Sequence, residues 1–287
     1  MFIEPIQCDR CGNRGRPGTD FDVSGNPCNE LRCRCGHVFA LVNGRDQCAL
    51  SKHIFLRLEA LSNHSEHGAV MLVPGQTANV TFSRPFDYVC RAFLTPNSRS
   101  PVIAQEAHLQ TSGMIILAGR FESSAPITEA VEISWLVHGL CNVNSLPPWR
   151  VHFFAAATHL ANGLYKPALL DYSAAFELFL ETYIREKLIQ SYGTACTEHL
   201  LRKSWRVEDR CKDLLELATG HRLSERSDVY QPWDTDVRRV RNELAHGTVV
   251  PIDHAAAESA HQATYQAIRW VECLQRVCAI GLSSQSL

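Results

Sequence analysis

The chain has 287 residues, 45% hydrophobic and 20% charged, a composition that excludes disorder throughout and allows one large domain or roughly two to three smaller ones. The formal net charge of −2 excludes a global field that draws the protein onto nucleic acid, so any nucleic-acid site must be a local patch. No apolar run approaches the roughly 18 residues that span a bilayer, and the N-terminal sequence lacks the pattern of a secretory signal, so we expect a cytoplasmic protein with no membrane partner.

Residues 1–50 are poor in large apolar side chains and hold several of the chain's 12 cysteines. Cys8-Asp-Arg-Cys11 and Cys33-Arg-Cys35 form a CxxC and a CxC pair, and two such knuckles can surround Zn²⁺ with four thiolates. The segment resembles a zinc ribbon, in which a closed four-cysteine site is structural and not catalytic. The predicted zinc ligands are Cys8, Cys11, Cys33 and Cys35. Cys28 is a spare cysteine, His37 could replace Cys35, and a redox dithiol or ordinary reduced cysteines are the alternatives.

Residues 51–142 differ in composition, because runs of β-branched and apolar residues are separated by Pro, Gly, Asn and Ser. Short strands between such turn residues are typical of an antiparallel sandwich or a small barrel. The runs that we predict as strands are Ile54–Leu58, Val70–Val73, Ala78–Phe82, Tyr88–Leu94, Met114–Ala118 and Val131–Val137.

Residues 143–287 change again, because the apolar residues now recur at the three-to-four spacing of helices. The predicted helices span 149–163, 166–190, 206–219, 234–246 and 253–280, which indicates an all-α bundle. The apolar face of the second helix consists of Leu169, Tyr172, Phe176, Phe179, Leu180 and Tyr183. Gly220 and Gly247 fit helix C-terminal stops, and Asp253 fits the N-cap of the last helix.

The stretch 236–247 contains an arginine and a histidine, Arg241 and His246, with four residues between them. Residues i and i+5 lie about 140° apart around a regular helix, so the two side chains would diverge on one. They converge more easily if the helix ends near His246, which Gly247 allows.

The sequence Arg241-Asn-Glu-Leu-Ala-His246 resembles the Arg-x4–6-His motif of the HEPN superfamily, in its form with asparagine after the arginine. The resemblance covers roughly residues 149–287 and includes the stretch 173–180 on an early helix. It implies a metal-independent endoribonuclease that acts as a homodimer, with the two motifs facing each other across a cleft. The expected fold is thus multidomain α+β: a zinc ribbon (1–50), a β-rich sandwich or small barrel (51–142) and a HEPN helical bundle (143–287).

The chemistry that the resemblance implies suits these side chains, because RNA carries its own nucleophile in the 2′-hydroxyl. His246 would act as general acid and base, and Arg241 would hold the phosphate and stabilise its transition-state charge. Asn242 would orient the phosphate or the imidazole, and the products would be 2′,3′-cyclic phosphate and 5′-hydroxyl ends. Arg238 and Arg239 are candidates for RNA contacts, with solvated surface charge as the alternative.

HEPN nucleases often serve in toxin–antitoxin and anti-phage systems, so the resemblance implies a defence role with an inhibitor or trigger protein as partner. One alternative is a non-catalytic HEPN module for nucleotide or RNA binding and dimerisation. Another is a zinc-ribbon adaptor in a nucleic-acid-related complex. Glu177 and Asp171 could support His246 or pair within the bundle, and His152 and His159 share a helix face that we interpret as structural.

Overall fold

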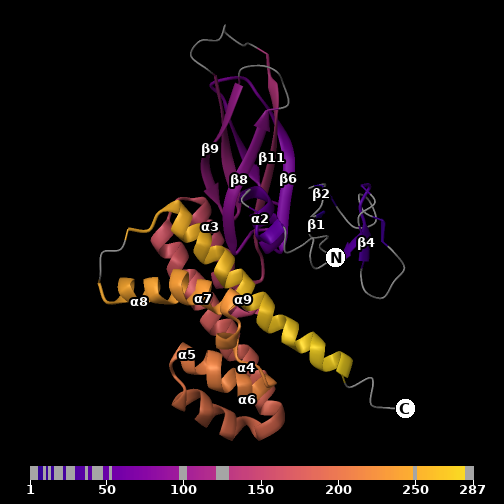
Figure 1. Ribbon diagram of the computed structural model, residues 1–287. Coiled ribbons are helices and arrows are strands. Elements are labelled where there is room, and N and C mark those ends of the chain that lie inside the picture. The colour runs from indigo at the N-terminus through magenta and orange to yellow at the C-terminus, as the bar shows by residue number, and fades with distance from the viewer. Residues whose placement is uncertain are drawn as a thin grey trace. The chain divides into compact units, whose positions relative to one another are not determined.

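The computed structural model divides the chain into two compact units, Met1–Leu146 and Pro147–Leu287, and each is described by itself. Figure 1 shows mainly strands in the first unit and helices in the second. The structure describes residues 6–8, 11, 14–15, 22–23, 30–35, 38–40, 48–51, 54–96, 102–120, 129–247 and 251–281.

The N-terminal part consists of short antiparallel strands. Their bounds are β1 (Ile6–Gln7), β2 (Arg14–Gly15), β3 (Asp22–Val23), β4 (Glu30–Arg32) and β5 (Val38–Ala40). β1 pairs with β2, and β3, β4 and β5 form a sheet in that order. Cys8 directly follows β1 and Cys33 directly follows β4, so each cysteine pair lies between two paired strands. The spare Cys28 and the alternative ligand His37 lie outside the described residues.

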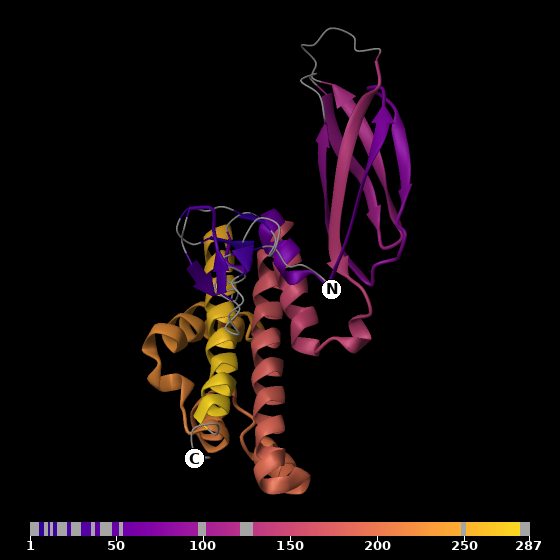
Figure 2. The same cartoon turned by 90° about the vertical axis from the view of Figure 1, so that its right-hand side faces the viewer.

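The middle of the chain forms two small antiparallel sheets, as the β-rich prediction expected (Figure 1; Figure 2). The first has the order β6-β11-β8, with β6 (His64–Leu72), β11 (Val131–Leu140) and β8 (Tyr88–Pro96). The second has the order β7-β10-β9, with β7 (Thr77–Thr81), β10 (Gly113–Arg120) and β9 (Val102–Gln110). Alternate side chains of both sheets enter one apolar core, which includes Phe82, Phe86, Met114, Ile116, Ile133 and Val137.

The prediction of a strand at Ile54–Leu58 is wrong, because these residues begin a helix, α2 (Ile54–Leu61). Leu, Arg, Glu and Ala, which dominate the segment, are strong helix formers, and only Ile54 is β-branched. Leu56 and Leu58 are buried, and Arg57 donates a hydrogen bond to the Ser51 carbonyl at 2.8 Å. A short apolar run fits helix or strand equally well, and here the residue types decide.

The C-terminal unit is helical, as predicted, with apolar positions recurring along each long helix. The long helices are α3 (Pro148–Ala161), α4 (Tyr165–Lys203) and α9 (His254–Gly281). Between α4 and α9 lie α5 (Val207–Asp209), η2 (Arg210–Leu214), α6 (Leu215–Thr219), α7 (Ser227–Trp233), η4 (Asp234–Arg239) and α8 (Val240–Ala245). Two 3₁₀ turns, η1 (Val143–Ser145) in the first unit and η3 (Leu223–Glu225) in the second, complete the elements.

The core of the bundle confirms the apolar face predicted for the second helix. Its six residues are all at most 6% exposed: Leu169, Tyr172, Phe176, Phe179, Leu180 and Tyr183. The Tyr172 hydroxyl lies 2.9 Å from Nδ1 of His261 on α9, and the Phe176 ring contacts the buried Trp233 of α7. The predicted N-cap is also confirmed, because the Asp253 carboxylate accepts a hydrogen bond from the Ala256 N–H at 2.8 Å.

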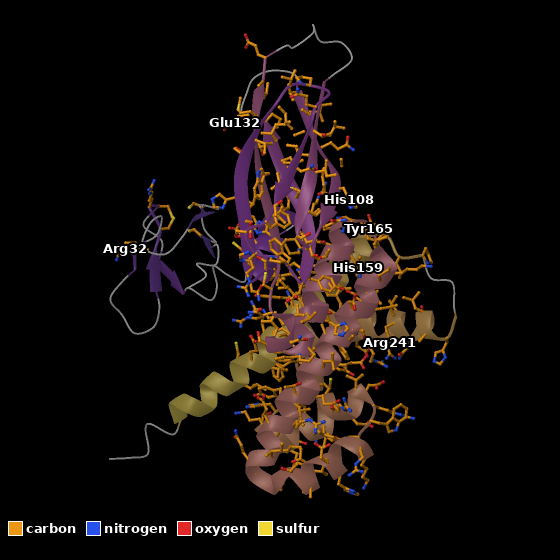
Figure 3. All side chains as sticks on the ribbon, turned by 180° about the vertical axis from the view of Figure 1, so that it is seen from behind. Arg32, His108, Glu132, His159, Tyr165 and Arg241 are labelled. Atoms are coloured by element: carbon orange, nitrogen blue, oxygen red, sulfur yellow. The ribbon has the colours of Figure 1, made fainter. Side chains whose placement is uncertain are left out.

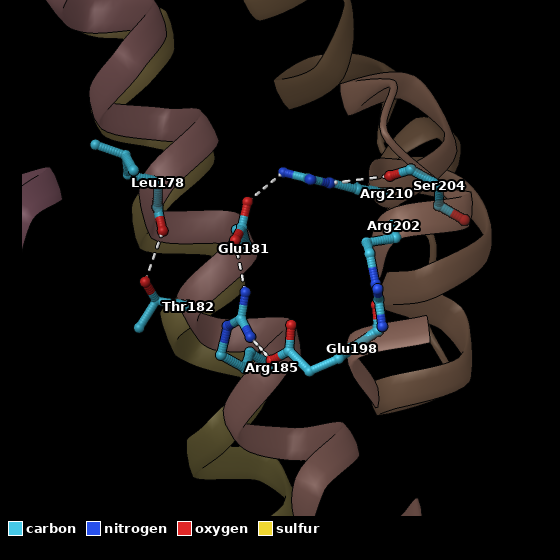
Figure 4. Close-up of polar contacts among 8 residues, drawn as sticks. All are labelled: Leu178, Glu181, Thr182, Arg185, Glu198, Arg202, Ser204 and Arg210. Atoms are coloured by element: carbon cyan, nitrogen blue, oxygen red, sulfur yellow. Dashed lines mark hydrogen bonds and ion pairs between the residues drawn. The ribbon is translucent and has the colours of Figure 1, made fainter. Parts of the chain in front are cut away.

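Helix α4 bends sharply at Gly193, which has φ 73° and ψ 167°. This backbone region is essentially restricted to glycine, so the residue type determines where the helix changes direction. The bend divides α4 into a long arm before Gly193 and a short arm after it. Figure 4 shows that Arg185 of the long arm pairs with Glu198 of the short arm and with Glu181 of its own arm, and that Glu181 also pairs with Arg210 of η2 at 2.7 Å. The predicted end at residue 190 therefore lies close to the bend, and the second arm was not predicted.

Two segments of the bundle are π-helical, η2 and η4. A π-turn accommodates one extra residue in a helix and is frequent at functional sites. The second of them, η4, follows a proline inside α7, Pro232, which cannot donate a backbone hydrogen bond, and leads directly into α8. Among the described residues, every helix is too short or too polar to cross a lipid bilayer.

Candidate functional site

Four cysteine sulfurs gather in the N-terminal part, and they are the four that the CxxC and CxC spacing predicted. The sulfur atoms of Cys8, Cys11, Cys33 and Cys35 lie within 4.8 Å of one another. Cys8 Sγ is 3.8 Å from Cys35 Sγ, and Cys11 Sγ is 3.5 Å from Cys33 Sγ. Tetrahedral zinc with bonds of about 2.3 Å separates its sulfur ligands by about 3.8 Å, so the cluster fits a metal ion of this kind.

The surroundings of Cys33 favour its thiolate, the form that binds metal. Hydrogen bonds, first from the backbone N–H of Cys35 and then from the neighbouring thiols, outweigh the effect of desolvation and lower the pKa of the Cys33 thiol to about 7. Cys8 and Cys33 are buried, whereas Cys11 and Cys35 are exposed. Four protein ligands would fill a tetrahedral shell, so the arrangement is consistent with a structural metal site and not with a catalytic one.

The second candidate site is the end of α8, which carries Arg241, Asn242 and His246. The helix ends near His246, as predicted. The His246 N–H makes the last helical hydrogen bond, to the Asn242 carbonyl at 3.0 Å, and Gly247 then leaves the helix with φ 77°. His246 thus occupies the C-cap and is exposed to solvent. Within the described ranges, its side chain forms no hydrogen bond or ion pair, so the imidazole is open to a ligand.

Arg241, which is labelled in Figure 3, has polar contacts with two side chains. Its Nη1 donates to the Asn242 side-chain oxygen at 3.1 Å, and its Nη2 lies 3.7 Å from Oε1 of Glu177 on α4. Glu177 also accepts a hydrogen bond from the Ser173 hydroxyl at 3.0 Å. Sequence reasoning considered Glu177 as support for His246, whereas the carboxylate contacts the arginine of the motif.

Arg238 and Arg239, the candidates for RNA contacts, both form ion pairs with Asp234. Arg238 also pairs with Glu208 and its side chain is only 17% exposed, whereas that of Arg239 is 64% exposed. Burial opposes ionisation of Asp234, but the hydrogen bonds and charges of the two arginines outweigh it and lower the pKa of the carboxyl. The geometry thus gives Arg238 a clear structural function and leaves Arg239 accessible.

His152 and His159 on α3 are joined by a residue that the sequence did not link to them. The two carboxylate oxygens of Asp171 lie 2.9 Å from His152 Nδ1 and 3.4 Å from His159 Nε2. The spacing of the two histidines predicted that they share a helix face. Their contact with the Asp171 carboxylate could not be predicted, because it depends on how α3 and α4 pack. The contacts agree with the structural interpretation of these histidines.

The second sheet has a hollow on its outer face, with a cavity volume of about 290 Å³. The register explains it: Gly113 of β10 is paired with Thr81 on one side and Gln110 on the other, so a row of three positions lacks its central side chain. Asn79 and His108 border the next row (His108 is labelled in Figure 3). A Cβ at Gly113 would lie 2.3 Å from the Val80 carbonyl oxygen, so the strands approach closely only because this residue is glycine.

No protein-family model matches the chain, and no curated protein matches it. Among solved structures, a similarity is found to the P. aeruginosa R1 pyocin fiber comprising C-terminal residues 323–701. The identity is 15%, and the match covers 26% of this chain and 22% of that chain, with a TM-score of 0.22. A similarity this small supports no statement about the fold or activity of this chain.

Proposed function

We propose that the C-terminal unit is a metal-independent endoribonuclease of the HEPN type. The observation that carries this proposal is the end of α8, where Arg241, Asn242 and an exposed His246 lie on the last two helical turns before Gly247. Support also comes from the helical environment, since α8 contacts α4 and precedes the long helix α9.

The proposed reaction uses the 2′-hydroxyl of RNA as nucleophile on the adjacent phosphorus. His246 removes the proton of this hydroxyl and returns a proton to the leaving 5′-oxygen. Arg241 binds the phosphate oxygens and stabilises the negative charge that develops on them, while Asn242 restrains the guanidinium through its hydrogen bond of 3.1 Å. The products are a 2′,3′-cyclic phosphate and a 5′-hydroxyl.

In the N-terminal part, we propose that the four cysteines hold one structural Zn²⁺. The sulfur separations and the lowered pKa of Cys33 support this assignment. The zinc ribbon and the β-rich part would then recognise RNA, an inhibitor or a trigger protein. By resemblance, the active form is a cytoplasmic homodimer in a toxin or anti-phage setting.

One observation favours a second candidate function, a non-catalytic RNA- or nucleotide-binding module. The carboxylate of Glu177 lies close to the Arg241 guanidinium, so it partly neutralises the positive charge that would stabilise the additional negative charge of the transition state. Such a module would bind RNA through α8 without cutting it.

The test is cleavage of a mixed tRNA and mRNA pool by wild type and His246→Ala, without added metal and with the product ends mapped. His221→Ala is the matched control, because His221 is an exposed histidine of the same unit. Cleavage by wild type and His221→Ala alone, leaving 2′,3′-cyclic phosphate ends, supports the nuclease. Equal cleavage by His246→Ala excludes the mechanism, and RNA binding without cleavage by wild type favours the binding module. Chelators are avoided, since they would remove zinc from the ribbon.

A further inference from the structure

The turn between α4 and α5 carries an unusual combination of side chains. Trp205 is 71% exposed, the highest value among the large apolar side chains of the described residues. The guanidinium carbon of Arg206 lies 5.2 Å from the centroid of its ring. The exposed indole ring presents an aromatic face that is available to a ligand.

The charged side chains of residues 202–206 are all positive, and the nearest carboxylates along the chain are those of Glu198, Glu208 and Asp209. Arg202, Lys203 and Arg206 are exposed, and in the described part of the chain none of them forms an ion pair. Most other arginines of the helical unit are paired with a carboxylate: Arg185, Arg210, Arg222, Arg226, Arg238, Arg239, Arg241 and Arg269. The turn is thus a local basic patch on a chain whose net charge is −2.

The turn is also held firmly in place (Figure 4). Arg210 donates from Nε to the Ser204 carbonyl at 3.0 Å and from Nη1 to Glu181 at 2.7 Å. Its backbone N–H bonds to the Arg206 carbonyl at 3.2 Å. The residues on both sides of Trp205 are therefore anchored to the long arm of α4, and the ring is presented by a fixed backbone.

We propose that the turn 202–206 is a binding platform for single-stranded RNA, in which a base stacks on Trp205 and Arg202, Lys203 and Arg206 contact the flanking phosphates. Stacking on an aromatic ring combined with a positive track is how proteins bind single strands without reading their sequence. One face of the indole is covered by the Arg206 guanidinium, which leaves the other face for a base. The choice of RNA rests on the proposed nuclease function; the stacking geometry and the charges do not depend on it.

The experiment is fluorescence anisotropy with a labelled single-stranded RNA of about 12 nucleotides, using full-length His246→Ala protein so that the RNA stays intact. Trp205→Ala is expected to weaken binding roughly 5- to 100-fold, whereas Trp205→Phe, which keeps an aromatic face, retains most of the affinity. Changing Arg202, Lys203 and Arg206 together to Gln should reduce the slope of log affinity against log salt by about 2.

Arg226→Gln is the matched charge control, because its guanidinium is exposed but paired with Asp228 at 2.9 Å. It should leave both the affinity and the salt slope unchanged. RNA should also quench tryptophan fluorescence in the parent protein more than in Trp205→Phe.

Unchanged RNA affinity in Trp205→Ala overturns the platform, and so does tighter binding of an acidic peptide than of RNA. These outcomes are separable from failure of the nuclease, because binding is measured in a cleavage-deficient protein. If wild type cuts RNA and Trp205→Ala binds normally, the platform alone is wrong. If wild type cuts nothing but binding depends on Trp205, the platform stands and the nuclease does not.

Discussion

The Arg241 guanidinium lies 3.7 Å from the carboxylate of Glu177, which joins the proposed catalytic helix α8 to the long helix α4. The two side chains are 41% and 31% exposed, so water screens the pair and its contribution to stability is small. A phosphate can therefore replace the carboxylate as the partner of Arg241 at little cost to the fold.

We expect Arg241→Gln to reduce RNA cleavage by about 100- to 1,000-fold, because the charge developing on the phosphate loses its main stabilising group. The free energy of unfolding, measured in urea, should change by less than about 1 kcal/mol. Arg222→Gln is the control, since Arg222 is also an exposed arginine paired with a carboxylate, Glu216. Full activity in Arg241→Gln would remove this arginine from the mechanism.

Replacement of Cys33 by Ser should abolish metal binding by the four-cysteine cluster. Zinc content, measured by mass spectrometry of the purified protein, is expected to fall from about one ion per chain to nearly none, because three ligands hold a structural zinc poorly. Cys196→Ser is the control, since Cys196 is an exposed cysteine of the helical unit. If Cys33→Ser keeps its zinc, the ion is bound elsewhere.

Asp234→Asn should destabilise the helical unit by about 3 kcal/mol at pH 7, because it removes a buried carboxylate from Arg238. The pKa of Asp234 is lowered in the folded state, so its contribution is present above the unfolded pKa of about 4 and is lost as pH falls through the folded value. In urea unfolding, the difference between wild type and Asp234→Asn should shrink on acidification. Asp228→Asn, which changes an exposed carboxylate, should have little effect at either pH; an equal loss in both variants would contradict the assignment.

Gly193→Ala should destabilise the protein by about 1–3 kcal/mol through backbone strain. Apart from its chain neighbours and the backbone of its own helix, no atom of the described residues lies within 4 Å of the added Cβ, so a clash cannot be the cause. Ser191→Ala, on the same exposed stretch of α4, is expected to be nearly neutral in thermal or urea unfolding. A neutral Gly193→Ala would mean that the bend in α4 does not persist in solution.

The sequence was most informative where spacing alone determines geometry. The cysteine pairs predicted the four-sulfur cluster, and the three-to-four spacing from Leu169 to Tyr183 predicted the buried face of α4. It was least informative for pairings between distant elements, such as Asp171 with the two histidines or Glu177 with Arg241, because these depend on how α3, α4 and α8 pack. The error at Ile54–Leu58 has a local cause, since a short apolar run has no clear period.

The π-helical segment η4 sets the direction in which the motif faces. Each residue advances an α-helix by about 100°, so the extra residue of a π-turn rotates everything after it by about that angle relative to Trp233. A continuous α-helix from Trp233 onward would aim Arg241 away from Glu177 and α4. Deletion of one residue from Asp234–Arg239 would thus let the segment become α-helical and keep the motif facing α4, whereas an α-helical segment of unchanged length would turn the motif to another side of the bundle.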